Sequence, residues 1–315
     1  MKVHFYTTTN TNNGYGMTRE YFKKFLPKYG IELTDEFQRL GLCLHIPPAI
    51  QHMKSDIKVL YTMIEGDQVP DSWKQYLDMA DHIIVPTRWV QSVFAKAGYK
   101  TTVINLGYDS EIFTYKERKR GEKFRFLHYE AFQNRKGWQD LLDAWYGLQE
   151  LEDAELILKT ILPYQKIPED VQQFQNVKVI SGELPHRCLN DILHTVDCFV
   201  FPSRGEGFSL PPLEAMATGL PTVITNGHSH TEYYDERYMY GVPADIQIPA
   251  RYSNWEDQGN FVRCSPASLE KVLLHVYMNP DEAFEKGKNA SRIVKQFSYD
   301  NTAKALSEYL CQLVQ

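Results

Sequence analysis

The sequence predicts an α/β fold with parallel strands, divided between two domains. Short apolar runs rich in β-branched and aromatic residues alternate with amphipathic stretches along the whole chain, which is typical of strands alternating with helices. The 315 residues suffice for two such domains, each with its own hydrophobic core. Hydrophobic residues make up 43% and charged residues 23%, an ordinary composition for a globular protein.

In the first half of the chain, a strand is expected at 3–6, followed by a polar loop that ends in Gly14-Tyr15-Gly16. An amphipathic helix is expected from about Met17 to Lys28, where Gly30 ends it. The further predicted strands are 42–46, 59–63, 83–85 and 102–104, and the predicted helices between them are 71–79 and 89–97.

A charged segment, 117–123, interrupts the pattern before the next apolar run at 124–128. Its mixed charges favour a solvated connector over a phosphate-binding patch. We therefore expect a first domain at 1–115, a linker at 116–123 and a second domain from 124. In the second half, the predicted strands are 124–128, 155–159 and 177–180, and the predicted helices are 138–148, 189–196, 266–277, 280–294 and 300–314; periodicity does not resolve 227–260.

The most informative segment is 198–225, which predicts a strand, a loop, a helix and a strand. The run Cys198–Phe201 is short, aromatic and β-branched, as a buried parallel strand is. Pro211 and Pro212 fit the first turn of a helix, which Gly219 ends. The loop 205–210 then delivers backbone amides to a helix N-terminus, where a phosphate group binds readily. Glu206 and Glu214 flank that point.

Glu206-x7-Glu214 and its flanks resemble the motif of the family 4 retaining glycosyltransferases. The resemblance covers about twenty positions, among them Pro202-Ser203-Arg204-Gly205-Glu206-Gly207-Phe208. It implies the GT-B fold, in which two Rossmann-like domains face each other across a cleft. It also implies a nucleotide-diphosphate sugar, a UDP- or GDP-sugar, as donor. The domain 1–115 would serve the acceptor, 124–295 would bind the donor, and a C-terminal helix at 296–315 would cross back to the first domain.

The resemblance also assigns roles to the two glutamates and to the loop between them. Glu214 corresponds to the glutamate that binds the ribose hydroxyls. Glu206 corresponds to the catalytic glutamate near the donor sugar. The loop amides that would touch diphosphate and sugar are those of Gly207, Phe208, Ser209 and Leu210.

A second element of the same domain would supply positive charge. Asn134-Arg135-Lys136-Gly137-Trp138 resembles the element whose cations neutralise the diphosphate, with Lys136 in the catalytic lysine position. The family's arginine lies five or six residues earlier, where this chain has Glu130 or Ala131. Arg135 is therefore the substitute that we expect.

In the first domain, Gly14-Tyr15-Gly16 resembles the glycine-rich turn at which the backbone approaches the donor phosphate and the acceptor. Many relatives present a histidine to the donor sugar after a central strand. Glu65 lies in a comparable place here and is the predicted catalytic replacement, with His45 as the alternative. The segment Ser181-Gly182-Glu183-Leu184 lies where relatives line the nucleobase pocket, and an ordinary strand-to-helix loop explains it equally well.

Net charge and cysteine content limit the expected binding partners and the expected cellular compartment. The net charge of −6 gives no general attraction to nucleic acid or anionic lipid. Five scattered cysteines without a Cys-x-x-Cys pair favour a reducing compartment, so we expect a cytoplasmic protein. No apolar run approaches the length of a membrane-spanning helix, so no such segment is expected. Lys23, Lys24 and Lys28 leave a peripheral membrane contact open. No prosthetic group and no catalytic metal are expected, because no Asp-x-Asp triplet or ligand-spaced cluster occurs.

The leading hypothesis is a retaining glycosyltransferase that moves a hexose from a nucleotide-diphosphate sugar to a hydroxyl acceptor. Three alternative functions are weighed against it. A glycosidase with Glu206 and Glu214 as its acid and base leaves Lys136 unexplained. A non-catalytic subunit that binds a sugar nucleotide shares the donor site and would show no turnover. A glycosyltransferase acting on a hydroxylated base in DNA would need a basic face. Within the leading hypothesis, the acceptor stays open among a small molecule, a glycan precursor and a modified nucleic acid.

Overall fold

The computed structural model describes residues 1–9, 14–162, 166–251 and 257–315. These residues form two compact units. Unit 1 comprises 1–109, 249–260 and 296–315, and unit 2 comprises 110–248 and 261–295. The predicted loop before Gly14 and the segment 227–260 lie partly outside the described residues.

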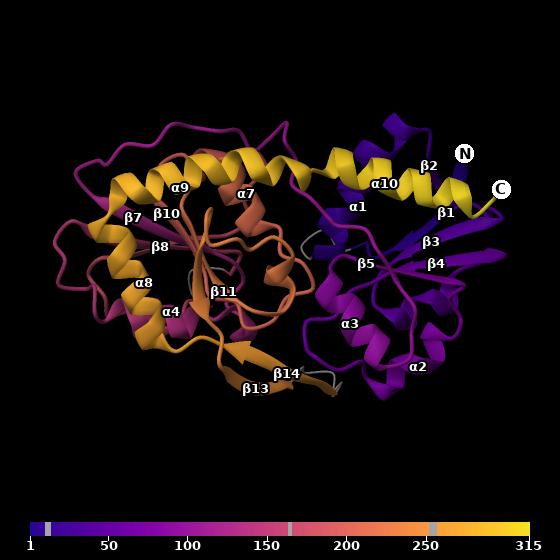
Figure 1. Cartoon of the computed structure of the whole chain (residues 1–315), viewed down its shortest axis with the longest axis horizontal. Helices are drawn as coiled ribbons and strands as arrows, with labels where there is room; N and C mark the ends of the chain where they lie inside the picture. Colours follow the sequence, from indigo (N-terminus) through magenta and orange to yellow (C-terminus); the bar gives the residue numbers. More distant parts are fainter. Residues whose placement is uncertain (10–13, 163–165, 252–256) are drawn as a thin grey trace. The chain divides into compact units, whose positions relative to one another are not determined.

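Unit 1 is built on a six-stranded parallel sheet of order β2-β1-β3-β4-β5-β6. In Figure 1, α1 and α10 lie on one face of this sheet, and α2 and α3 lie on the other. The strands are β1 (Lys2–Thr7), β2 (Glu32–Thr34), β3 (Leu40–Leu44), β4 (Ile57–Tyr61), β5 (His82–Val85) and β6 (Thr102–Val103). The helices are α1 (Gly14–Phe25), η1 (Leu26–Tyr29), η2 (Pro47–His52), α2 (Asp71–Leu77), α3 (Arg88–Lys96) and α10 (Tyr299–Gln312).

Unit 2 is built on a second six-stranded parallel sheet, of order β12-β11-β10-β7-β8-β9. Its strands are β7 (Phe124–Tyr129), β8 (Ala154–Thr160), β9 (Val177–Ser181), β10 (Cys198–Phe201), β11 (Thr222–Asn226) and β12 (Tyr240–Pro243). Its helices are η3 (Asn134–Lys136), α4 (Trp138–Trp145), α5 (Glu169–Gln172), α6 (His186–Leu193), α7 (Pro211–Ala217), η5 (His228–Glu232), α8 (Pro266–Met278) and α9 (Pro280–Ile293).

A few elements remain outside these sheets and helices. The strands β13 (Ile246–Arg251) and β14 (Asp257–Arg263) form a separate two-stranded sheet, and η6 (Val294–Gln296) follows α9. The parallel α/β prediction is confirmed by the two six-stranded sheets.

Each sheet reverses its strand order at one point, and these two points position the candidate residues. In unit 1 the order turns between β1 and β3, and in unit 2 it turns between β7 and β10. In open α/β sheets, the loops that leave the carboxyl ends of such neighbouring strands diverge and leave a crevice for a ligand. The loop after β7 carries Lys136, and the loop after β10 carries Glu206.

The charged segment 116–123 is anchored within unit 2. Arg118 donates hydrogen bonds to the carbonyls of Leu193 (2.8 Å), Val196 (2.9 Å) and Thr218 (2.9 Å). These carbonyls lie at or just beyond the ends of α6 and α7, where helix geometry leaves acceptors without intrahelical partners. The chain passes from unit 1 to unit 2 earlier, between Asp109 and Ser110.

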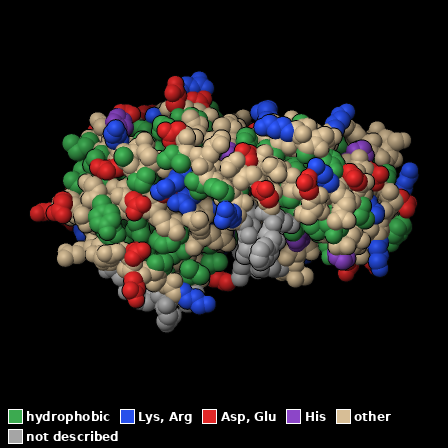
Figure 2. Space-filling model, turned by 90° about the horizontal axis from the view of Figure 1, so that it is seen from below, with side chains coloured by type: hydrophobic (Ala, Val, Ile, Leu, Met, Phe, Trp, Pro, Cys, Tyr) green, Lys and Arg blue, Asp and Glu red, His purple; other side chains and the backbone are tan. Residues whose placement is uncertain are grey.

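The surface gives two plain observations. On the face shown in Figure 2, the described acidic and basic side chains are mixed rather than gathered by sign. In the part of the chain that the structure describes, no helix is both long and apolar enough to span a membrane.

Candidate functional site

Lys136 and Glu206 meet at the switch point of unit 2. The Lys136 Nζ lies 2.7 Å from the Glu206 Oε1, and both side chains are nearly buried, at 7% and 8% exposed. Arg135 Nη1 lies 3.0 Å from the same oxygen. Ser203 Oγ donates to it as well, at 2.6 Å. The positions of these residues in the sequence do not predict the individual contacts. The strand order brings the residues together, because β7 and β10 are neighbours in the sheet.

The two oxygens of Glu206 are in different environments. Lys136, Arg135 and Ser203 all contact Oε1. Within the described residues, Oε2 has no hydrogen-bond partner. The carboxylate is therefore held in place through one oxygen, while the other remains able to accept a hydrogen bond from a ligand hydroxyl.

The pKa of Glu206 reflects the two cations. Burial alone would raise its pKa, but the charges of Lys136 and Arg135 and the hydrogen bonds of Lys136 and Ser203 lower it to about 2. Glu206 is therefore ionised throughout the neutral range.

Lys136 also binds a second carboxylate. Its Nζ lies 2.6 Å from Glu130 Oε1, and the Glu130 side chain is 18% exposed. Glu130 occupies one of the two positions at which the resembled family has an arginine. The chain thus places an acid there. Arg135 Nη1 donates to the Gly205 carbonyl at 3.0 Å, and the role of Arg135 as the substitute arginine remains a prediction.

A buried ion network joins the loops that carry these groups. Asp140 is fully buried, and its carboxylate accepts from Arg204 Nε at 2.8 Å and from Arg263 Nε at 2.6 Å. Arg204 also donates to Asn134, and its backbone amide donates to the Arg135 carbonyl at 2.7 Å. The loop after β7 and the loop after β10 are thus fixed to each other beside the Lys136–Glu206 pair.

Gly137 permits the close approach of the two loops. It has φ +69°, a conformation that glycine adopts at little cost, and it separates η3 from α4. A Cβ at this position would collide with the carbonyl oxygen of Pro202, which leads into the Glu206 loop.

Glu214 lies in the first turn of α7, as predicted, and is buried. The hydroxyl of Tyr129, the last residue of β7, donates to Glu214 Oε2. This contact places Glu214 at the same edge of the sheet as Lys136 and Glu206. The role predicted for Glu214, binding of ribose hydroxyls, remains a prediction.

The loop between Glu206 and α7 combines core packing with backbone donors. The Phe208 side chain is buried and packs edge-on against Tyr233, with centroids 5.9 Å apart. In the part of the chain that the structure describes, the amides of Gly207, Ser209 and Leu210 meet no backbone acceptor. Pro211 and Pro212 begin α7 and carry no N–H group, so any backbone donors at this helix start come from the preceding loop.

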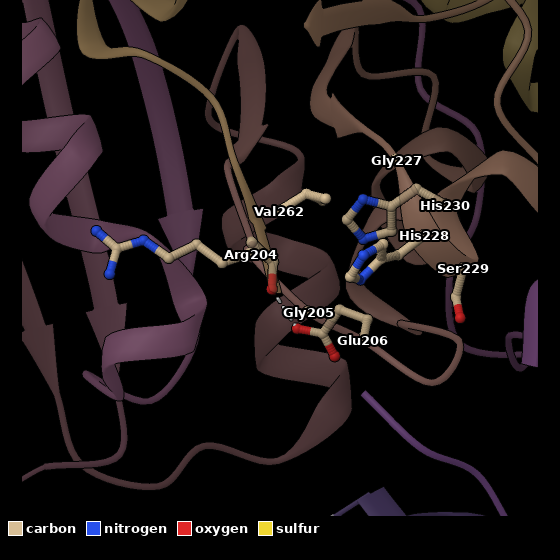
Figure 3. A pocket seen from close by; sticks show the side chains of 9 residues that line it. Arg204, Gly205, Glu206, Gly227, His228, Ser229, His230 and Val262 are labelled. Atoms are coloured by element: carbon tan, nitrogen blue, oxygen red, sulfur yellow. Dashed lines mark hydrogen bonds between the residues drawn. The ribbon is translucent and has the colours of Figure 1, made fainter. Parts of the chain in front are cut away.

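Sequence reasoning did not identify His230, which lies on η5 beside the Glu206 loop. A hollow lined by Ser203, Glu206, His228 and His230, among others, lies at this point. Figure 3 shows both imidazole rings on one side of the hollow next to Glu206, with the Arg204 side chain pointing away from them. No local motif marks His230, because its contact with Ser209 joins two segments that are separate in the sequence.

In unit 1, the predicted glycine-rich turn is part of a helix. α1 begins at Gly14, so Gly14, Tyr15 and Gly16 form its first turn rather than a loop ahead of Met17. The Tyr15 ring stacks on His45, with centroids 5.4 Å apart and an interplanar angle of 3°. Tyr15 and His45 follow β1 and β3, the two strands of the switch point in unit 1.

His45 and Glu65 have distinct surroundings within unit 1. His45 Nδ1 accepts from the Ile46 amide at 2.9 Å, so the neutral ring carries its hydrogen on Nε2. Burial lowers the pKa of His45 and so favours this neutral form. Glu65 is half-buried, and its backbone amide faces Gln258 Oε1 at 3.4 Å. Which of the two residues faces the donor sugar stays a prediction.

The segment 181–184 begins with the last residue of β9, in unit 2. Gly182 has φ +93°, and its carbonyl accepts from Lys159 Nζ at 2.5 Å. Among the described residues, no group of three or more His, Cys, Asp or Glu side chains is arranged to hold a metal ion.

Comparisons with known proteins bear on the fold and the family. Residues 123–247, which include Lys136, Glu206 and Glu214, match the family model described as Glycosyl transferases group 1. The solved structure of Alr3699/HepE from Anabaena, in complex with UDP and glucose, superposes with a TM-score of 0.74 at 14% identity, over 99% of this chain and 100% of that one. The chain has the GT-B glycosyltransferase fold.

Two curated relatives share this similarity. The serotype-specific mannosyltransferase WbdA of Escherichia coli is 28% identical over 203 residues, which cover 60% of this chain and 22% of WbdA. The MMP alpha-(1->4)-mannosyltransferase of Mycolicibacterium hassiacum is 28% identical over 218 residues, which cover 67% of this chain and 48% of that protein. The chain thus spans less than half the length of each of these relatives. Together with the GT-B fold, the matches support a glycosyltransferase family.

Proposed function

We propose that this chain is a retaining glycosyltransferase of family 4 that transfers a hexose from a UDP- or GDP-sugar to a hydroxyl acceptor. The observation that carries the proposal is the site at the switch point of unit 2. There, Lys136 and Arg135 hold one oxygen of Glu206 and leave the other oxygen without a partner among the described residues. HepE was solved with UDP and glucose, and WbdA is named a mannosyltransferase, which supports a hexose on a nucleotide donor.

The donor has three parts, and the site offers a group for each. The diphosphate would lie against Lys136, Arg135 and the amides of the 207–210 loop. The ribose hydroxyls would donate to Glu214, which lies at the same sheet edge. A sugar hydroxyl would donate to the second oxygen of Glu206.

The proposed reaction is a front-face displacement that needs no metal. The bond from the anomeric carbon to the diphosphate oxygen breaks, and the electron pair leaves with the diphosphate. The acceptor hydroxyl attacks from the same face and gives its proton to the departing phosphate. Lys136 and Arg135 stabilise the charge on the leaving group, and preorganised charges of this kind usually make the largest contribution to catalysis.

In this proposal, unit 1 has the acceptor role predicted for residues 1–115. Gly14, Tyr15 and Gly16 would approach both the donor phosphate and the acceptor. Glu65, or alternatively His45, would face the donor sugar. The acceptor is a compound with a free hydroxyl group: a small molecule, a glycan precursor or a modified nucleic acid.

A screen of sugar nucleotides tests the proposal. UDP-, GDP- and ADP-sugars are compared for thermal stabilisation of the protein and for slow hydrolysis without acceptor. We expect one of them to stabilise the protein, Glu214→Ala to weaken binding, and Lys136→Ala to reduce mainly turnover. The exposed His275→Gln on α8 serves as a control that changes neither. Absence of stabilisation by every sugar nucleotide would contradict the proposal, and tight binding without turnover would favour a non-catalytic subunit.

A further inference from the structure

The hydrogen bonds of His230 define which ring nitrogen carries its proton. His230 is 2% exposed, and its Nδ1 lies 2.8 Å from the Thr225 carbonyl oxygen. Because a carbonyl only accepts, Nδ1 carries a hydrogen. The other nitrogen, Nε2, lies 3.3 Å from Ser209 Oγ. In the neutral ring Nε2 is an acceptor, so the Ser209 hydroxyl donates to it.

Ser209 adopts a backbone conformation that favours glycine. Its φ is +78°, and among the described non-glycine residues only His228 shares a positive φ. Ser209 lies within the loop between Glu206 and α7, and His228 lines the hollow beside Glu206. A serine held in this conformation two residues before α7 places a hydroxyl group, rather than a bare backbone, in the loop proposed to hold the diphosphate.

The groups around His230 set its response to an anion. Glu206, from the loop after β10, favours the protonated ring, and Lys136, from η3, disfavours it. The rings of Phe201 and Tyr233 pack against it, and the Tyr233 hydroxyl stays protonated because burial raises its pKa. Burial is the largest influence on His230 and lowers its pKa, so the ring is neutral in the unliganded protein. An added negative charge nearby shifts this balance toward the protonated form.

We propose that His230 and Ser209 form a relay that donates a hydrogen bond to the diphosphate of the donor. The relay rests on the proposed function. When the ring takes up a proton from solvent at Nε2, it becomes the donor to Ser209 Oγ, and the serine hydroxyl turns its own hydrogen toward a phosphate oxygen. No covalent bond other than that to the proton forms or breaks. Ser209 contacts the ligand, and His230 is a positioning residue that acts through it.

Proton uptake on binding tests the relay. UDP-glucose and GDP-mannose are titrated calorimetrically into the protein near neutral pH, in two buffers of different ionisation enthalpy. The diphosphate of a sugar nucleotide has no group that titrates in this range, so any uptake belongs to the protein. We expect net proton uptake by the wild type, no uptake by His230→Gln, and unchanged uptake by the control His275→Gln.

Ser209→Gly separates ligand binding from folding. Glycine suits the backbone at this position, so the variant should fold with an unchanged or higher melting temperature. Loss of a hydrogen bond to a charged ligand should weaken its affinity for the sugar nucleotide about tenfold. A serine with a purely structural role would give the wild-type affinity.

The outcomes distinguish the relay from the proposed function. Binding with proton uptake that His230→Gln abolishes, and weaker binding by Ser209→Gly, support the relay. Binding by the wild type without proton uptake, uptake that persists in His230→Gln, or equal affinity of Ser209→Gly overturns the relay and leaves the proposed function intact. Binding of neither sugar nucleotide overturns both.

Discussion

At the scale of single residues, Glu206 shows how a buried charge is kept available for a ligand. An unpaired carboxylate in this environment would be costly and would take up a proton. Lys136, Arg135 and Ser203 stabilise the ionised form through Oε1 alone. The orientation of the carboxylate is thereby fixed, and a hydrogen bond at Oε2 needs no rearrangement of its partners.

The lowered pKa of Glu206 predicts a loss of stability in acid. Because the pKa is lower in the folded than in the unfolded chain, the ionised form contributes stability that is fully present above the unfolded pKa and is lost as pH falls toward about 2. Between about pH 5 and about pH 3, the free energy of unfolding should fall more steeply for the wild type than for Glu206→Gln. Equal slopes in urea titrations would contradict this assignment.

We expect Glu130 to oppose the binding of an anionic ligand at Lys136. Its carboxylate lies 2.6 Å from Lys136 Nζ and would repel a diphosphate placed beside that lysine. Glu130→Gln removes this competing charge and should tighten sugar-nucleotide binding about fivefold to tenfold. Calorimetric titration measures the change, and Glu285→Gln on α9 is a matched control, because Glu285 also pairs with a lysine of unit 2 but is exposed. Weaker binding by Glu130→Gln would mean that Glu130 helps to hold the ligand.

The sequence singles out candidate residues but not their contacts. Lys136, Glu206 and Glu214 are selected by local motifs and by the resemblance of these motifs to a known family, and their roles remain predictions. The Glu130–Lys136 pair and the Ser209–His230 contact could not be predicted, because they depend on how separate loops meet. Spacing along the chain carries no such information.

At the scale of elements, the parallel strands of unit 2 bring loops that are distant in the sequence to the same edge of the sheet, where the carboxyl ends of the strands lie. The turn of strand order between β7 and β10 places the loops after these strands side by side. The Arg204–Asp140–Arg263 network and the close contact of Gly137 with Pro202 then fix the loops to each other. A site made of two loops thereby gains the rigidity of the sheet.

Gly137→Ala should destabilise unit 2. The substitution adds an unfavourable backbone conformation and a collision with the Pro202 carbonyl, at a cost of about 3 kcal/mol or more. Gly182→Ala is the matched control, because Gly182 also has a positive φ but has open space around it. Its cost should be only about 1 kcal/mol. Urea unfolding measures both, and equal costs would show that the close approach to Pro202 is unimportant.

The elements that the sequence did not predict are of two kinds. β2 has three residues and α5 has four, too few for a hydrophobic period to appear. β13 and β14 are longer, but they lie in or next to the segment 227–260, which shows no clear period. α1 begins three residues before the predicted Met17, because glycines at 14 and 16 are typical of turns and mask the helix start. Outside that segment, the longer strands and helices agree with the prediction to within a few residues at their ends, since burial of one face dictates their pattern.

At the scale of the whole molecule, each unit has its own core. Trp73 and Phe94 belong to the core of unit 1, and Trp145 and Phe126 belong to that of unit 2. The proposed donor residues of the Lys136–Glu206 site all lie in unit 2. A donor ligand should therefore stabilise unit 2 directly.

Calorimetry should show whether the ligand stabilises unit 2 alone. We expect two thermal unfolding transitions, and a bound sugar nucleotide should raise the midpoint temperature of one of them. At a ligand concentration about 100 times the dissociation constant, the stabilisation is about 2.7 kcal/mol, which corresponds to a rise of about 5 to 10 °C. Proteolysis at intermediate temperature would identify the raised transition as that of unit 2. A rise of both transitions by equal amounts would contradict the assignment.

The packing of α10 on α1 has a consequence for synthesis on the ribosome. Tyr299 stacks on Tyr21, and Ser307 donates to the Tyr29 carbonyl, so α10 covers α1. Every segment of unit 2 has been translated before α10 emerges. Translation of unit 1 therefore begins before that of unit 2 and ends after it, and the face of α1 that packs on α10 has no helical partner while the whole of unit 2 is made.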